Sequence, residues 1–278
     1  MTTNSAAESL SDDVLDEYLR FACRLAELAG EAILPHFRSA LSVKNKARFG
    51  YDPVTIADKS AEHVIRAEIS RCYPAHSIFG EEYGSSSGPS SLTWVIDPID
   101  GTRGFVMGLP QWGTLIALND GARPVLGVMY QPFVGDLFVG SRQGAYLRRA
   151  GSVQELHTRQ VDDLADALLC ATHPDMFKES REQAAFSRVA GACKQTRYGT
   201  DCYAWCLLAA GLIDLVIESQ LNPYDIQAPI AIIEAAGGVV TNWLGQPAYE
   251  GGQVIAAGDP KLHRIALDIL MGAHVDGI

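Results

Sequence analysis

The sequence predicts a layered α/β fold arranged in two lobes. Two amphipathic helical segments come first, short strand-like runs follow them, and beyond about residue 155 strands and helices alternate. Apolar residues make up 47% of the 278 and charged residues 20%, which is typical of globular proteins. We expect a loose tail over 1–11, an N-terminal α+β lobe over 12–155 and a C-terminal α/β lobe over 156–278.

Two helices are expected in the first quarter of the chain. From Asp12 to about Leu41, apolar residues recur at spacings of three and four, and Pro35 either kinks or ends this helix. The segment 44–55 contains glycine and proline and is expected to be a loop. A second helix is expected over 57–72, with its inward face formed by Ala61, Val64, Ile65 and Ile69.

The strands of the first half are short apolar runs between turn residues. The Asp120-Gly121 dipeptide between two of them favours a hairpin. The expected strands are 77–80, 92–97, 112–119, 124–132, 136–141 and 144–149. In the second half we expect, in chain order, strand 167–172, helices 178–191 and 201–211, strand 213–218, helix 226–238, strands 239–243 and 253–258, and helix 260–271.

Composition argues against several classes of partner and site. The chain has 22 basic and 33 acidic residues, a net charge of -11, so we expect neither nucleic acid nor a membrane surface as a partner. The six cysteines are scattered without zinc-site spacing and are expected to be reduced core thiols. The N-terminal residues have no export signal and no apolar run is long enough to span a bilayer, so a cytoplasmic protein is expected.

Acidic residues gather at element boundaries, where binding sites are usually built. Asp58 begins a helix, Glu81 and Glu82 close a strand, "WVIDPIDGT" ends a strand with Asp97 and Asp100, and Asp225 opens a helix. Converging carboxylates repel one another, and cations would reverse the sign of that interaction. All-oxygen ligands favour Mg²⁺, which prefers to share phosphate oxygens. Gly101 and Thr102 then offer backbone amides to the phosphate.

Each acidic residue has a simpler interpretation when it is taken alone. Asp58 and Asp225 are placed as helix N-caps, the two glutamates as a solvated turn, and Asp97 and Asp100 as turn residues. An aspartyl-phosphate mechanism of the haloacid dehalogenase type needs two aspartates with one residue between them. Here Pro98 and Ile99 both intervene, so that mechanism is disfavoured.

The chain resembles the inositol monophosphatase family of Mg²⁺-dependent, lithium-sensitive phosphatases. The matching motifs are "DPVTIADKSAE", "GEE", "WVIDPIDGTRGF" and "NPYDIQAPIAIIEAAGG", in the family's order from residue 53 to 238. The resemblance implies a layered αβαβα fold of the inositol monophosphatase and fructose-1,6-bisphosphatase type. It also implies a homodimer and a phosphoric monoester hydrolase activity with two or three Mg²⁺ ions per active site.

The resemblance also implies a role for each matching residue. Glu81, Asp97 and the Ile99 carbonyl would hold one metal; Asp97, Asp100 and Asp225 would hold a second; Glu81 would also lie near a weaker third. Thr102 and Asp58 would orient and deprotonate water beside the catalytic Glu81, the amides of Gly101 and Thr102 would bind phosphate, and Glu82 would support the ligands from behind. Two departures from the family pattern are Ile56, where glutamate is common, and Tyr224, where tryptophan is common.

Within the family, "DGTRGFVMGLPQWGTLIAL" and "YGTDCYAWCLLAAGLIDLVIE" most resemble the histidinol-phosphate phosphatase branch, which acts in histidine biosynthesis. Asp201 and Glu218, together with Asp100, are expected to bind substrate. Their negative charge would favour a cationic leaving group such as histidinol. Asp201 is alternatively a helix N-cap, and Glu218 a strand-end surface residue.

Trp112, Tyr203 and Trp205 either shape the pocket or, for most of them, pack in the core. The alternative function is an inositol-1-monophosphatase or broad sugar monophosphatase. A third possibility from another class is a non-enzymatic, metal-dependent phosphoester sensor.

Overall fold

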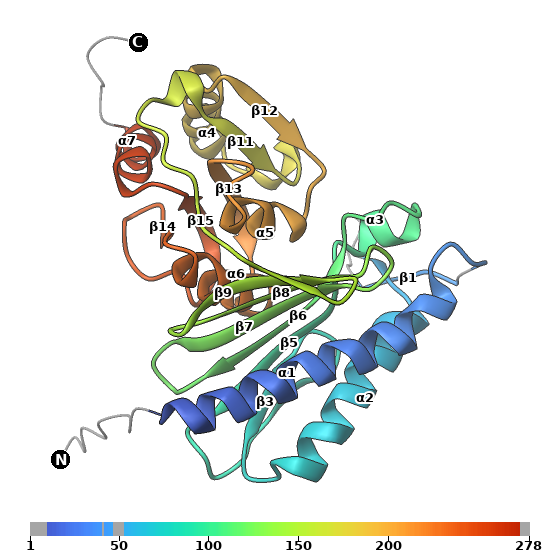
Figure 1. Cartoon of the computed structure of the whole chain (residues 1–278). Coiled ribbons are helices and arrows are strands. Elements are labelled where there is room, and N and C mark those ends of the chain that lie inside the picture. Colours follow the sequence, from blue (N-terminus) through green and yellow to red (C-terminus); the bar gives the residue numbers. More distant parts are fainter. Residues whose placement is uncertain (1–9, 41, 47–52, 273–278) are drawn as a thin grey trace, which may run out of the picture.

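The computed structural model describes residues 10–40, 42–46 and 53–272, and these form alternating layers of helix and sheet (Figure 1). Helices α1 (Asp12–Ile33) and α2 (Ile56–Cys72) cover the outer face of an eight-stranded sheet. Helices α5 (Tyr203–Ala209) and α6 (Pro223–Ala235) lie between this sheet and a five-stranded sheet. Helices α4 (Ser180–Ala192) and α7 (Pro260–Met271) cover the far side.

The large sheet has the strand order β10-β9-β8-β7-β6-β5-β3-β4, and the small sheet has the order β12-β11-β13-β15-β14. The large sheet contains β3 (Ser77–Gly80), β4 (Gly84–Ser86), β5 (Thr93–Asp100), β6 (Gly113–Asn119), β7 (Pro124–Gln131), β8 (Asp136–Ser141), β9 (Gly144–Arg149) and β10 (Ser152–Glu155). The small sheet contains β11 (Leu168–Ala171), β12 (Gln195–Tyr198), β13 (Leu215–Leu221), β14 (Val239–Asn242) and β15 (Gly252–Ala257).

Short elements complete the described chain. They are β1 (Lys44–Asn45), β2 (Pro53–Val54), the helix α3 (Thr102–Val106) and the 3₁₀ turns η1 (Leu34–His36), η2 (Leu164–Asp166) and η3 (Pro174–Met176). No helix among the described residues combines the length and apolar character needed to cross a lipid bilayer.

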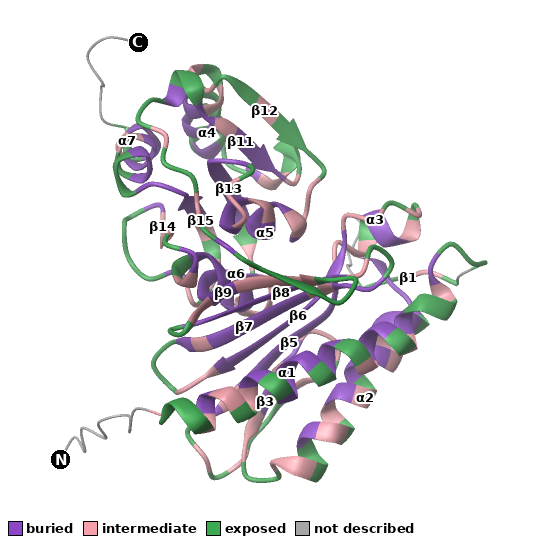
Figure 2. Cartoon of the chain, viewed as in Figure 1, coloured by how far each residue is buried: buried purple, intermediate pink, exposed green. Residues whose placement is uncertain are grey.

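Buried residues gather on the faces of the helices and strands that pack against one another (Figure 2). Ile65 of α2 packs with the outer face of the large sheet, while Leu115 of β6 and Ile230 of α6 share the core between the two sheets. Leu215 of β13 belongs to the third core, beneath α4 and α7. The predicted layered α/β fold is confirmed.

Helix α6 lies against the large sheet because that sheet has glycines beneath it. A Cβ on Gly127 of β7 would lie 2.2 Å from the Ala228 carbonyl oxygen, and one on Gly140 of β8 would lie 2.4 Å from the Ile232 Cα. Any larger residue would push the helix away. Since α6 is enclosed by both sheets, its sequence is apolar on nearly every side.

Most of the expected elements are present, with shifted ends. The first helix stops at Ile33 and passes into a 3₁₀ turn, because Pro35 has no N–H to continue the ladder. Val64 is only partly buried, whereas Ala61, Ile65 and Ile69 are buried as predicted. The expected loop 44–55 contains the paired strands β1 and β2, and its residues 47–52 lie outside the described chain.

The expected division into lobes stays a prediction. The boundary at 155 and 156 falls after β10, the last strand of the large sheet, yet side chains from both sides of it share the core between the sheets. Nine of the residues expected to form a tail, 1–9, lie outside the described residues, and Ser11 caps α1 by accepting a hydrogen bond from the Val14 N–H.

Candidate metal and phosphate site

A bulge in β5 brings Asp97 and Asp100 together. Along a regular strand, residues three apart point to opposite faces of the sheet. Here Asp97 pairs with Leu115 and Asp100 pairs with Gly113, so two residues oppose one and the alternation is reset. Asp97 is 2% exposed, and its Oδ1 accepts a hydrogen bond from the Ile99 N–H at 3.0 Å.

Asp225 reaches the same place from the start of α6. It is the third residue of that helix, where its carboxylate accepts a hydrogen bond from the Asn222 N–H at 2.6 Å in a capping box. One carboxylate oxygen each from Asp97, Asp100 and Asp225 lies within 4.8 Å of the other two. Residues more than a hundred positions apart therefore form one acidic cluster.

Glu81 and Glu82 follow β3 and are bridged by Lys46. The Lys46 ammonium donates to Glu81 Oε1 at 2.7 Å and to Glu82 Oε1 at 2.8 Å. The turn that carries them is fixed from beneath by Glu62 of α2, which is fully buried and accepts hydrogen bonds from the backbone N–H groups of Glu82 and Tyr83.

The carboxyl groups perturb one another strongly. Burial, together with the charges of Glu81, Asp100 and Asp225, raises the pKa of Asp97 well above its usual range. Burial also raises the pKa of Glu81 to about 7 and that of Asp225 to about 6. Without a cation, therefore, ionising the whole cluster near neutral pH is unfavourable. The donors are all oxygens, so the cluster fits a hard divalent cation such as Mg²⁺.

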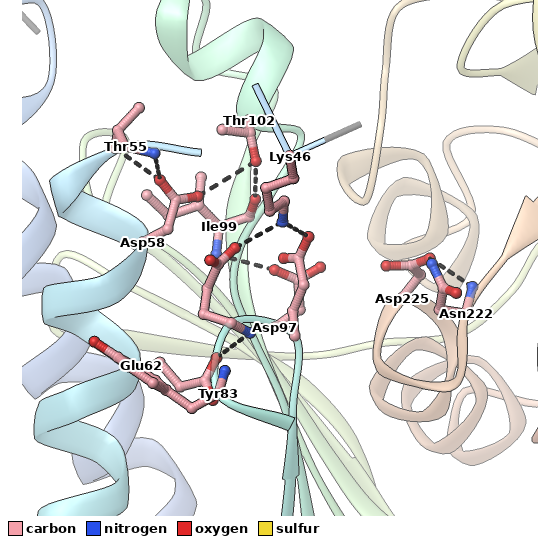
Figure 3. A network of polar contacts seen from close by, with 12 residues as sticks. Lys46, Thr55, Asp58, Glu62, Tyr83, Asp97, Ile99, Thr102, Asn222 and Asp225 are labelled. Carbon is pink, nitrogen blue, oxygen red and sulfur yellow. Dashed lines mark hydrogen bonds and ion pairs between the residues drawn. The ribbon is translucent and has the colours of Figure 1, made fainter. Parts of the chain in front are cut away.

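Asp58 and Thr102 form a polar pair beside this cluster. Asp58 is fully buried at the third position of α2, where its Oδ2 accepts from the Thr55 N–H at 2.8 Å and from the Thr55 hydroxyl at 2.7 Å. The Thr102 hydroxyl lies 2.9 Å from the Ile99 carbonyl oxygen and 3.4 Å from Asp58 Oδ1 (Figure 3). A hydroxyl has one proton, so Thr102 donates to one of these oxygens at a time.

An open pocket of about 310 Å³ adjoins the cluster and includes Asp100, Gly101, Thr102 and Asp225 in its lining. Gly101 adopts a left-handed conformation (φ 85°), and a Cβ there would lie 2.7 Å from the Gln111 carbonyl oxygen. The chain therefore turns sharply at Gly101 immediately before α3.

Comparison with known proteins places this geometry in a family. The family model described as the inositol monophosphatase family matches residues 14–271. The chain belongs to the inositol monophosphatase family. A relative from Arabidopsis thaliana named bifunctional phosphatase IMPL2, chloroplastic, is 39% identical, and the alignment covers 96% of this chain and 79% of the relative.

Two further proteins are similarly close to this chain of the inositol monophosphatase family. A histidinol-phosphatase of Streptomyces coelicolor is 36% identical, with 90% of this chain and 95% of the relative covered. A solved inositol monophosphatase from Zymomonas mobilis is 38% identical with a TM-score of 0.83, covering 94% of this chain and 100% of that one. The chain is therefore an inositol monophosphatase family phosphatase with an acidic cluster suited to metal.

The residues expected to select substrate occupy different depths in this phosphatase. Asp201 lines the pocket, and burial raises its pKa to about 6. Glu218 is not among the lining residues. It is 1% exposed, and its Oε1 accepts from the Thr172 N–H at 2.7 Å and from the Thr172 hydroxyl at 2.9 Å, so it lies behind Thr172, which does line the pocket. The alternative prediction, that Glu218 is a surface residue at the end of a strand, is wrong because the side chain is buried.

The interpretation of Asp58, Asp225 and Asp201 as N-cap residues is also wrong, because each lies one or more positions away from the N-cap. Asp58 and Asp225 are third residues of their helices, and the N-cap residues are Thr55 and Asn222. The N-cap of α5 is Cys202, one residue after Asp201. A capping box explains the local geometry of Asp58 and Asp225 and leaves one carboxylate oxygen of Asp58 turned to Thr102.

The large aromatic residues near the site pack in the core. Trp112 is fully buried against Phe37 and Phe105, and Trp205 is 3% exposed. The Tyr203 hydroxyl donates to Asp136. Of the two departures from the family pattern, Ile56 is 56% exposed, and Tyr224 packs near Phe79 with ring centroids 5.8 Å apart.

Sequence reasoning missed Lys46, Arg103 and Gln220. Lys46 lies in a segment with no motif, and only its contacts with two glutamates reveal its place. Arg103 and Gln220 line the pocket. Arg103 could have been found as the residue that follows Gly101 and Thr102, but the conformation of Gln220 has no signal in the sequence.

The raised pKa values predict how the metal-free phosphatase responds to pH. Burial raises the pKa of Glu218 to about 8. Glu81, Asp225 and Glu218 therefore all hold protons more tightly in the folded state than in the unfolded chain. Their stabilising contribution is complete below about pH 4 and is lost as pH rises through about 6–8. In EDTA we expect the free energy of unfolding to fall by at least about 2 kcal/mol between pH 5.5 and 8.5.

Urea unfolding at several pH values measures this change. Mg²⁺ should remove the part of the loss that comes from Glu81 and Asp225, because a bound cation stabilises their ionised carboxylates, and it should leave the part that comes from Glu218. A metal-free stability that rises across this pH range would contradict the electrostatic description of the cluster.

Proposed function

We propose that this chain hydrolyses L-histidinol phosphate to L-histidinol and orthophosphate in a Mg²⁺-dependent reaction of histidine biosynthesis. The observation that carries the proposal is the juxtaposition of the Asp97, Asp100 and Asp225 cluster with a pocket that also contains Asp201. The similarity to a protein named histidinol-phosphatase, at 36% identity, supports the choice of substrate.

In this proposal the metal ligands are the carboxylates of the cluster. Glu81, Asp97 and the Ile99 carbonyl hold one Mg²⁺, and Asp97, Asp100 and Asp225 hold a second, with Glu81 also near a third. When bound, Mg²⁺ neutralises phosphate charge and lowers the pKa of water. The Lys46 ammonium contacts Glu81 Oε1 at 2.7 Å, so Mg²⁺ would bind Glu81 through its other carboxylate oxygen.

Asp58 and Thr102 handle the proton of the attacking water. Thr55 occupies Asp58 Oδ2, which leaves Oδ1 facing the Thr102 hydroxyl. Thr102 accepts a hydrogen bond from the water while its own proton points to Asp58, so a proton can pass to Asp58 Oδ1. The backbone amides of Gly101 and Thr102 bind the phosphate, and Glu82 supports Glu81 by sharing Lys46.

Asp201, Asp100 and Glu218 select the leaving group. Asp201 lines the pocket, and Glu218 is 1% exposed behind Thr172 with one carboxylate oxygen that has no hydrogen-bond partner among the described residues. Asp201 adds negative charge beyond the metal ligands, which favours an alcohol that carries an ammonium or imidazolium group, whereas burial raises the pKa of Glu218 to about 8 and keeps it largely neutral near pH 7.

Replacing Asp201 with Asn tests the charge argument. We expect kcat/KM for L-histidinol phosphate to fall roughly tenfold, and kcat/KM for inositol 1-phosphate to change less than about threefold, because only the first substrate has a cationic leaving group. Phosphate release is measured for the wild type and the variant. Equal losses for the two substrates would remove the charge rationale.

The wild-type arm of that assay decides between candidate substrates. Faster hydrolysis of inositol 1-phosphate would favour the alternative, an inositol or broad sugar monophosphatase, which the similarity to the solved Zymomonas mobilis enzyme supports. Binding of phosphate esters without Mg²⁺-dependent turnover would favour a sensor.

We also propose a cytoplasmic homodimer. All six cysteines are free, which suits a reducing compartment. Exposed apolar side chains at Met107, Leu109, Phe133 and Val134 flank Arg38, whose guanidinium lies 4.6 Å from the Phe133 ring centroid. This surface is a suitable face for a second copy, and the mass in solution by light scattering tests it.

A further inference from the structure

Two strained residues meet at the pocket. Among the described residues, four that are not glycine have a positive φ: Arg38, Ala150, Asp201 and Gln220. Asp201 (φ 42°) and Gln220 (φ 66°) both line the pocket beside the acidic cluster, although they come from different elements. Side chains with a Cβ are disfavoured in this conformation, and such outliers concentrate at functional sites.

A second bulge places Gln220 in the pocket wall. In β13, Glu218 pairs with Val254 and Leu221 pairs with Gly252, so Ser219 and Gln220 together oppose one residue of β15. Bulges of this kind redirect a side chain out of the regular alternation. Gln220 is exposed, whereas the five preceding residues of the strand are buried.

The bulge is held in place from the α4 side. Glu182 is 5% exposed, and its Oε1 accepts from the Ser219 hydroxyl at 3.0 Å and from the Gln253 Nε2 at 2.5 Å. Ser219 precedes Gln220 in the bulge, and Gln253 is the residue opposite it. Buried hydrogen bonds therefore stabilise a backbone conformation that glutamine alone would not favour.

The Gln220 carboxamide has a free acceptor. Its Nε2 makes one long contact, 3.4 Å, to the Ser219 hydroxyl, and its carbonyl oxygen has no hydrogen bond to the described residues. The Asp201 carboxylate is a second acceptor in the same pocket. Together they present oxygen atoms to a group that donates hydrogen bonds, such as an ammonium or an imidazole N–H.

We infer that Gln220 is a specificity-determining residue that contacts the leaving alcohol alongside Asp201. The identity of that alcohol as an amino alcohol rests on the proposed function. The contact itself does not, since any hydrogen-bonding alcohol in this pocket meets the same carboxamide.

Gln220→Gly removes the carboxamide and also removes the strain, because glycine adopts a positive φ freely. The assay is kcat/KM for L-histidinol phosphate, inositol 1-phosphate and glycerol 2-phosphate. We expect the preference for L-histidinol phosphate over glycerol 2-phosphate to fall roughly tenfold, as for one hydrogen bond to a charged group. The Mg²⁺ concentration for half-maximal activity should not change.

Ala150→Gly is the matched control. It relieves a positive φ (48°) in the turn between β9 and β10, outside the pocket lining. Both variants should unfold at a higher temperature than the wild type, but only Gln220→Gly should change the ratios between substrates. An altered ratio in both variants would attribute the effect to general loss of strain and overturn the inference.

The outcomes separate the two proposals. If the wild type prefers inositol 1-phosphate, the proposed substrate is wrong, and a changed ratio between any two esters in Gln220→Gly still supports the contact. If all three kcat/KM values change by one common factor within about twofold, Gln220 does not touch the alcohol and the inference fails, whichever substrate is best.

Discussion

Replacing Asp97 with Asn is expected to abolish phosphatase activity while making the metal-free protein more stable. Asp97 is 2% exposed and lies against Asp100, Asp225 and Glu81, so its ionisation is opposed by burial and by three like charges. An amide of the same shape removes that repulsion. Because Asp97 is the proposed shared ligand of two Mg²⁺ ions, replacing its carboxylate should lower kcat/KM on the order of 10³-fold or more.

Differential scanning calorimetry in EDTA and in Mg²⁺, together with phosphate release, tests both halves of this prediction. The variant should melt higher than the wild type in EDTA and gain less from Mg²⁺. Asp162→Asn is the matched control, because that side chain is 85% exposed and, within the part of the chain that the structure describes, its one ion pair is with Lys261. Activity within tenfold of the wild type would show that Asp97 is not a shared ligand.

Asp58→Asn is expected to reduce kcat by about 10²–10⁴-fold, the usual contribution of a positioned general base, with little change in KM. The substitution is conservative in structure. An Asn carbonyl oxygen still accepts from the Thr55 N–H and hydroxyl, so the capping box at the start of α2 survives. The amide nitrogen then faces Thr102 in place of Oδ1, and it cannot take a proton.

Three measurements separate a base from a structural residue. The melting temperature and the Mg²⁺ concentration for half-maximal activity should stay near those of the wild type, while the acid limb of the kcat profile disappears. Thr102→Val removes the hydroxyl between water and Asp58, so it should lose a similar factor, and the double variant should lose little more than either single one. Additive losses would mean that the two residues act independently.

Local sequence points to the candidate site residues but not to the backbone features that bring them together. Asp97 and Asp100 stand out because two acidic residues follow an apolar strand before Gly101, and Asp225 stands out at the start of a helical pattern. Their convergence depends on the bulge in β5, and a bulge has no fixed local pattern because the neighbouring strand determines it.

Strands without buried side chains could not be predicted from the sequence either. The strands β4, β10 and β12 are largely exposed, so they lack the apolar alternation that predicts a strand. By contrast, α2 and α7 carry clear stripes of apolar residues and cap residues, and their ends could be placed within a residue. The left-handed backbone of Gln220 is the clearest case of tertiary contacts overriding residue preference.

The enclosure of α6 between the two sheets has a consequence for the synthesis of the chain. Asp225 lies in the first turn of that helix, while Asp97 and Asp100 are made far earlier, on β5. The helix docks through Ile230 and Ile232 into a core that also needs β13. Most of the polypeptide must therefore emerge from the ribosome before Asp225 can reach Asp97 and Asp100. Contacts between residues so far apart in the sequence form slowly. The complete acidic cluster is thus expected only in chains that have been almost fully synthesised and folded. Partially synthesised chains would have only two of the three aspartates in place.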